Sequence, residues 1–306
     1  MVRQFLIAAG AFCLSTSCAI AQETEADVPG WLNKDFAELV EHFEGHWNND
    51  RHVFFAEDAG MDLSPIAPRQ HISIARVDVE DESDVVVFQA NRTVDGEAPA
   101  SLYHSFSIVA DKAVIMQTMS PSLAADDAPR CNVKWRRDGA QFHGRAGGEG
   151  CERLFPRTEG EGDLSVTMTL SERDFWVRSM RGAAVTEARF RQARPFECWT
   201  AILRGASHGD SGEGMRDWDF RRGVTLHDQG GEAELMTDEE TPRKIRLKLR
   251  NVDWPYGTNR PSLTLYIMEG DSDRAVSYAW NEGDAERIGI NLRWIQASCT
   301  HTPDTN

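Results

Sequence analysis

The stretch Cys131-Asn-Val-Lys-Trp-Arg-Arg-Asp-Gly-Ala-Gln-Phe-His-Gly-Arg145 contains two short strands and the turn between them. Val133 and Trp135 alternate with polar residues, which is the two-residue period of a strand with one buried face. The Asp-Gly pair at 138–139 is a hairpin signal, because glycine tolerates the backbone angles of a tight turn. Phe142 then begins the returning strand. The stretch therefore predicts an antiparallel β-hairpin.

The same period recurs on both sides of this hairpin. Short runs of β-branched and aromatic residues between polar turns are typical of strands. Before residue 200, the further predicted strands lie at 72–77, 85–88, 102–109, 114–119, 166–170 and 175–177. Many short strands with polar turns predict a mainly β fold, either a sandwich or an antiparallel barrel.

One helix is predicted ahead of these strands, over residues 31–47. Its glutamates, Glu38, Glu41 and Glu44, occupy one side, and Gly45 lies near the end, where a helix tends to stop. Apolar residues at helical spacing form the other side, namely Trp31, Leu32, Phe36, Leu39, Val40, Phe43 and Trp47. The helix therefore has one apolar face to bury.

A second β region follows the glycine- and serine-rich stretch 205–214, whose composition is typical of a linker or long loop. Within residues 244–250, apolar and basic residues alternate strictly, and further alternating runs continue to Trp294. We therefore expect two domains. The first is a β domain over 31–204, and the second is an antiparallel, β-sandwich-like domain over 206–300.

The N-terminus has the three parts of a secretory signal peptide. Arg3 supplies positive charge, residues 5–13 form an apolar run too short to span a bilayer, and Ala19-Ile-Ala21 is a small-x-small cleavage site. We expect residues 1–22 to be removed and the protein to be periplasmic or secreted. The stretch Ser15-Thr-Ser-Cys18 offers a lipid anchor at Cys18 as the alternative. No later segment has the length and apolarity of a transmembrane helix.

Four cysteines remain after the signal peptide is removed, an even number in an oxidising compartment. They allow three pairings. We favour Cys131–Cys151, which would staple neighbouring strands, and Cys198–Cys299, which would tie the end of the chain to its middle. The absence of a CxxC pair makes a zinc site a weak alternative.

The chain is acidic, with 49 aspartates and glutamates against 33 lysines and arginines and a net charge of −16. Such a surface repels nucleic-acid phosphates and anionic lipid, so binding to either through bulk charge is excluded. The sequence also lacks a GxSxG nucleophile elbow, a P-loop and a dinucleotide-binding glycine pattern between strand and helix.

Three segments carry a family resemblance. They are Glu44-Gly-His-Trp-Asn-Asn-Asp-Arg-His52, Val87-Phe-Gln-Ala-Asn91, and the hairpin at 131–145 with Cys151 behind it. Over about residues 31–200, the chain resembles the CpcT/CpeT family of phycobilin (chromophore) lyases. The resemblance implies a calycin-like antiparallel barrel of ten strands, with a ligand cavity at one mouth. It also implies a linear tetrapyrrole as ligand, with apolar walls for the rings and cationic groups for two propionates.

The motif segments and the strand pattern predict a set of ligand-binding candidates. They are Asn49, Arg51, His52, Gln89, Arg92, Tyr103 and His104. Turn capping by Asn49 and plain surface charge for the arginines are the alternatives. Only one of Tyr103 and His104 can face the lumen, since neighbouring residues of a strand point to opposite sides. We expect a packed tyrosine and an exposed histidine.

Two further histidines, His42 and His46, have the spacing that lets two imidazoles on one helix share a metal ion. A solvated helix face explains this pair better, and no metal site is predicted. No catalytic residue is assigned.

Three functions follow from these observations. The first is an exported binding protein for a small apolar or tetrapyrrole-like ligand held in the barrel. The second is a genuine chromophore lyase that attaches a bilin to a protein cysteine. The third is a non-catalytic envelope interaction protein. No cofactor is expected beyond a bilin or other tetrapyrrole as ligand, and a homodimer stays open.

Overall fold

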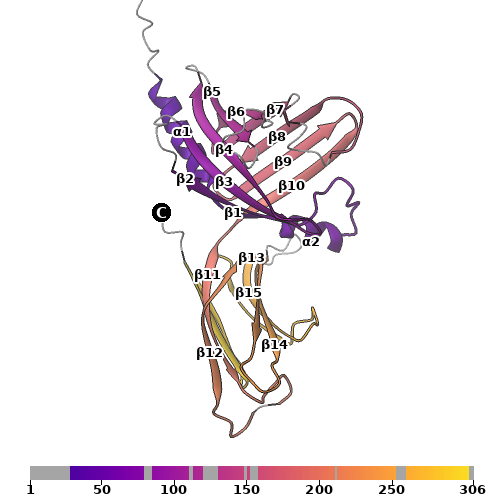
Figure 1. The fold of residues 1–306 in the computed structure, drawn as a ribbon, viewed down its shortest axis with the longest axis vertical. Coiled ribbons are helices and arrows are strands. Elements are labelled where there is room, and N and C mark those ends of the chain that lie inside the picture. The colour runs from indigo at the N-terminus through magenta and orange to yellow at the C-terminus, as the bar shows by residue number, and fades with distance from the viewer. Residues whose placement is uncertain are drawn as a thin grey trace, which may run out of the picture.

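The structure, a computed structural model, describes residues 28–78, 85–109, 113–119, 130–147, 150–151, 158–210, 212–252 and 260–302. Figure 1 shows two lobes that follow one another along the longest axis. We call residues 28–193 the barrel lobe and residues 195–302 the sandwich lobe. Both are mainly antiparallel β-sheet, which confirms the predicted fold class. The predicted signal peptide and Cys18 lie outside the described residues.

The barrel lobe is one antiparallel sheet that curls on itself. Its strands β2 to β10 pair in chain order, and the short β1 pairs with both β2 and β10, which closes the ring. The strands are β1 (Gly45–Asn48), β2 (Gln70–Val77), β3 (Val85–Val94), β4 (Ala100–Val109), β5 (Ala113–Met119), β6 (Cys131–Asp138), β7 (Gln141–Gly147), β8 (Leu164–Leu170), β9 (Asp174–Arg181) and β10 (Ala184–Ala193).

Helix α1 (Gly30–Phe43) packs its apolar face onto the inward side chains of this barrel. Phe43 is almost fully buried, with its ring centroid 4.9 Å from that of Phe106 and 5.6 Å from that of Phe88. The aromatic side chains of the interior therefore pack against a helix. The part of the lumen around Phe43 is filled by protein.

The predicted helix ran to residue 47, but α1 ends at Phe43. Glu44 is extended and Gly45 has a φ of +118°, so the chain turns there into β1. Trp47 faces inward from β1 and is fully buried. A second helix, α2 (Asp50–Asp58), follows β1 and packs beside β10. No helix was predicted there.

The sandwich lobe has two four-stranded antiparallel sheets, ordered β12-β11-β18-β17 and β13-β14-β15-β16. Inward residues of both sheets, among them Phe196, Ile245, Leu265 and Ile288, form one apolar core. The strands are β11 (Pro195–Leu203), β12 (Trp218–His227), β13 (Gln229–Met236), β14 (Lys244–Val252), β15 (Ser262–Glu269), β16 (Ser277–Glu282), β17 (Arg287–Asn291) and β18 (Ile295–His301).

The chain passes from the barrel to the sandwich lobe at Arg194, the single residue between β10 and β11. Arg194 ties this connection to the sandwich lobe, because its Nε donates to Asp228 Oδ2 at 2.7 Å and its Nη2 donates to the carbonyl of Gly283 at 2.7 Å. The glycine-rich stretch 205–214 lies between β11 and β12. The predicted domain limits at 204 and 206 remain predictions.

Two disulfides link the described cysteines in the favoured pattern. Cys131 pairs with Cys151, with 4.5 Å between their Cα atoms. Cys198 on β11 lies directly opposite Cys299 on β18, with 3.9 Å between their Cα atoms. Two disulfides indicate an oxidising, extracytoplasmic space. None of the helices in the described part of the chain is long and apolar enough to cross a membrane.

Candidate functional site

The predicted ligand-binding residues do not gather at one barrel mouth. Arg51 and His52 lie on α2 beside the barrel. Gln89 and Tyr103 are directly opposite each other on β3 and β4, and the next pair in the same register is Phe88 with His104. Because neighbouring positions alternate across a sheet, these two pairs point to opposite faces. The candidates therefore divide among the groove beside α2, the outer sheet face and the interior.

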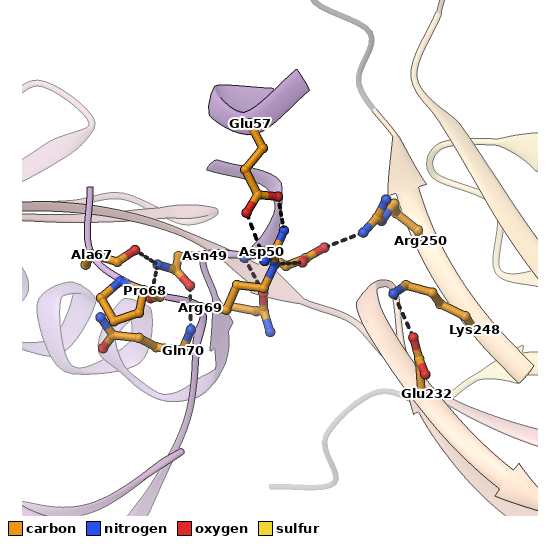
Figure 2. Close-up of polar contacts among 11 residues, drawn as sticks. Asn49, Asp50, Glu57, Ala67, Pro68, Arg69, Gln70, Glu232, Lys248 and Arg250 are labelled. Carbon is orange, nitrogen blue, oxygen red and sulfur yellow. Dashed lines mark hydrogen bonds and ion pairs between the residues drawn. The ribbon is translucent and has the colours of Figure 1, made fainter. Parts of the chain in front are cut away.

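Asn49 is fully buried between β1 and α2 and serves the fold. Its side-chain amide nitrogen donates to the carbonyls of Ala67 and Pro68 at 3.3 and 3.0 Å. Its side-chain oxygen accepts the backbone N–H of Gln70 at 2.6 Å. Figure 2 shows the amide turned toward residues 67–70, on the far side from Arg250. All of these bonds position the backbone ahead of β2.

His104 faces the barrel interior, so the expectation of an exposed histidine is wrong. Its ring lies edge-on to Phe43, with 5.2 Å between the centroids. It shares the inward face with Phe106, two residues further along the strand, and this register leaves Tyr103 on the outer face. Desolvation lowers the pKa of His104 to about 4, so the imidazole is neutral at neutral pH.

Arg92 is half-buried on the inward face of β3, opposite Ile72 and Ala100. Burial lowers the pKa of its guanidinium, and its Nε has no hydrogen-bond partner among the described residues. Arg92 is therefore the cationic candidate that the structure places toward the inside of the barrel. Arg51 and His52 lie outside the barrel, on α2.

Arg51 and His52 help to line a groove of about 560 Å³ between α2 and the outer face of β9 and β10. Small-molecule sites have volumes of about 300 to 1,000 Å³, so this groove has the right size. The strands contribute Trp176, Arg189 and Arg191, and α2 also contributes Phe55. Arginines and aromatic rings therefore surround one recess.

The central contact in the groove joins an arginine to an aromatic face. The guanidinium carbon of Arg189 lies 5.1 Å from the ring centroid of Trp176, whose side chain is 44% exposed. The Nε of Arg189 also forms an ion pair with Glu187. Arg191 lies 3.9 Å from Asp174, the distance joining Nη1 and Oδ1. Trp176 thus offers a flat, accessible ring beside fixed positive charge.

His52 fastens α2 to β10, the strand that carries the groove's arginines. Its Nδ1 lies 3.3 Å from the backbone nitrogen of Arg189 and accepts that N–H. Burial lowers the pKa of His52 and the charge of Arg189 lowers it further, while Glu187 opposes both. The neutral ring therefore accepts at Nδ1 and carries its proton on Nε2. His52 supports the groove wall as a neutral group.

The groove suits an anionic, flat ligand. Guanidinium groups match carboxylates with paired hydrogen bonds, and indole rings stack on planar apolar groups. Arg51, Arg189 and Arg191 meet here with Asp174 in the same lining and Glu187 paired to Arg189, so cationic groups outnumber carboxylates locally in a chain whose net charge is −16. Among the residues that the structure describes, no cluster of His, Cys, Asp or Glu is placed to hold a metal ion.

Sequence reasoning missed the strand half of this groove. The pattern Arg189-Phe190-Arg191 could have indicated it, because Phe190 is buried inward and the flanking arginines must then point outward. Without α2, however, nothing in the sequence shows that these arginines face Arg51. The contact between β10 and α2, which joins residues 137 positions apart, creates the groove.

No protein-family model and no curated protein sequence matches the chain. Among solved structures, the T-type phycobiliprotein lyase CpeT from Prochlorococcus phage P-HM1 matches it, with a TM-score of 0.31 and 13% sequence identity. The match covers 51% of this chain and 96% of that chain. A likeness of this size carries no inference about ligand or reaction. In about half of its length, the chain is similar in structure to that phycobiliprotein lyase.

Proposed function

We propose that this chain is a periplasmic or secreted binding protein that takes up a small anionic molecule with a flat apolar ring system. The observation that supports this is the pairing of Arg189 with the exposed ring of Trp176 in a groove of about 560 Å³. The rings of a ligand would stack on Trp176, and its carboxylates would pair with the arginines. Linear tetrapyrroles, with two propionates each, belong to this chemical class.

The first test is a titration of the purified protein with biliverdin and with haem, followed by absorbance and tryptophan fluorescence. The variant Arg189→Gln should weaken binding about tenfold or more, because a hydrogen bond to a charged group contributes about 1.5–3 kcal/mol. Trp176→Leu should weaken it as well and should reduce the quenching. Both side chains are on the surface of the groove, so the fold should survive.

Matched controls lie on the sandwich lobe, where Trp199 and Arg222 are also accessible. Trp199→Leu and Arg222→Gln should leave the affinity unchanged. If the control variants weaken binding as much as the groove variants do, the ligand does not bind in the groove. If no absorbance shift or quenching occurs at micromolar ligand, the tetrapyrrole class is excluded.

A further inference from the structure

Three imidazoles form a stack where the two lobes meet. His46 comes from β1, His71 from β2 and His227 from the end of β12. The centroids of His46 and His71 are 5.9 Å apart, and those of His71 and His227 are 4.8 Å apart. The ring planes differ by only 14° and 13°. His71 therefore lies between one ring of its own lobe and one ring of the other.

The register of the barrel directs these rings outward. On β1, Trp47 is fully buried in the barrel core, so its neighbour His46 points to the opposite face. On β2, His71 is followed by Ile72, which packs against the same core. The sandwich lobe covers this outer face with His227. Besides the Asp50–Arg250 ion pair, the lobes therefore meet through histidine, the side chain type that changes charge near neutral pH.

The carboxylates near the stack are already paired with arginines. Asp228, which is 1% exposed, accepts from Arg194 at 2.7 Å. Asp50, the first residue of α2, accepts from Arg69 at 2.9 Å and from Arg250 at 2.7 Å. Figure 2 shows the Asp50 carboxylate between these two arginines, one from each lobe. Asp228 and Asp50 are the carboxylates that act on His227, one from the connection before β13 and one from α2.

The surroundings therefore favour neutral rings. Burial, with smaller effects of His227 and His46, lowers the pKa of His71 to about 4. Burial also lowers the pKa of His227, although Asp228 and Asp50 oppose the shift. The Nδ1 atoms of His71 and His227 have no hydrogen-bond partner among the described residues. The two carboxylates that favour protonation of His227, Asp228 and Asp50, are already paired with arginines, so they only partly offset the cost of a buried charge.

We propose that the His46–His71–His227 stack is an acid-sensitive latch that holds the two lobes together when the rings are neutral and releases them when the rings are protonated. Three adjacent cations cannot stack, since like charges at about 5 Å repel and their burial costs solvation. The lobes are joined covalently by a single residue, Arg194, so they can separate without unfolding either core.

The sign of the pH effect follows from proton linkage. In separated lobes His71 would return toward the ordinary histidine pKa of about 6.5, so the separated state binds more protons between pH 6.5 and about 4. Docking is fully favourable above pH 6.5 and weakens as the pH falls. His71 alone should weaken the docking equilibrium about thirtyfold between pH 8 and pH 5.

The test is small-angle X-ray scattering of the full chain between pH 8 and pH 4.5, with circular dichroism to show that both lobes stay folded. We expect the radius of gyration to rise below pH 6.5. The double variant His71→Phe, His227→Phe keeps two flat rings without a titratable nitrogen and should stay compact at every pH. His208→Gln, on an exposed loop of the sandwich lobe, should behave like the wild type.

Two results would overturn the latch. One is a radius that stays constant in the wild type while NMR shows the His71 ring titrating near its ordinary pKa. The other is a rise in the radius of gyration below pH 6.5 that persists in the phenylalanine double variant. If that variant does not fold, His71→Gln replaces it, and its radius should change over a smaller range of pH than in the wild type.

Discussion

The side chains of Asn49 and His104 both serve the fold, the first through hydrogen bonds and the second by packing against Phe43. The side chain of Asn49 makes three hydrogen bonds to backbone groups and needs nothing from a ligand. His104 lies against Phe43 in the interior and stays neutral. Both were predicted as ligand-binding residues, because a polar residue in a motif looks the same in sequence whether it binds a ligand or the backbone.

Replacement of Asn49 should destabilise the barrel lobe. Asn49→Ala removes three hydrogen bonds and leaves two carbonyls and one N–H of residues 67–70 without their partner, which costs about 2–4 kcal/mol. Urea unfolding monitored by circular dichroism measures this. Asn33→Ala, at an exposed position of α1, is the control and should change the free energy of unfolding by less than about 0.5 kcal/mol. Equal stability of the two variants would contradict the role given to Asn49.

The neutral imidazole of His104 predicts a pH dependence of stability. Its folded pKa of about 4 lies below the unfolded value of 6.5, so the unfolded state takes up the proton first. Stability is therefore full above pH 6.5 and falls toward pH 4, by about 2 kcal/mol at pH 5 from this residue. His104→Leu should lose that part of the pH dependence in urea unfolding at pH 8 and pH 5. An unchanged difference between the two pH values would show that His104 does not titrate this way.

The boundary between α1 and β1 matters for closure of the barrel, because β1 is the strand that pairs with both β2 and β10. The helical period of apolar residues continues to Trp47 because Phe43 and Trp47 are buried in the same core, one from a helix and one from a strand. The indole Nε1 of Trp47 even donates to the carbonyl of Phe43 at 3.1 Å, the acceptor that a helical backbone N–H would use. Periodicity alone could not distinguish these two arrangements.

Gly45 makes the sharp change from helix to strand possible. Its φ of +118° is costly for residues with a side chain, and a Cβ atom there would lie 3.1 Å from Nε2 of Gln192. Gly45→Ala should therefore destabilise the barrel lobe by about 1–3 kcal/mol in urea unfolding. Gly30→Ala is the matched control, since nothing lies within 4 Å of its Cβ position and its φ is ordinary. An equally small effect of both substitutions would contradict this account.

Each lobe of the molecule has its own apolar core and its own disulfide. Cys131–Cys151 belongs to the barrel core and Cys198–Cys299 to the sandwich core. The second disulfide closes a sequence separation of 101 residues and the first a separation of 20. In the chain-entropy model, longer loops gain more from closure. The sandwich lobe therefore depends more on its disulfide than the barrel lobe does.

Removal of each disulfide should separate these contributions. The double variant Cys198→Ser, Cys299→Ser should lose about 4–5 kcal/mol, and Cys131→Ser, Cys151→Ser should lose about 3 kcal/mol. Differential scanning calorimetry of the full chain distinguishes the two lobes if they unfold in separate transitions. A larger loss for the 131–151 pair would contradict the loop-length argument.

The sequence alone determined the mainly β fold, the strand pattern, the first helix and the favoured cysteine pairs, because each depends on local periodicity or on spacing along the chain. It predicted Arg51 and His52 as ligand-binding residues but did not show what they face. Only the tertiary structure decided that α2 meets β9 and β10 to form a groove, and that His71 and His227 stack across the two lobes. Those contacts join residues more than a hundred positions apart, and no short-range pattern encodes which distant side chains become neighbours when a barrel closes.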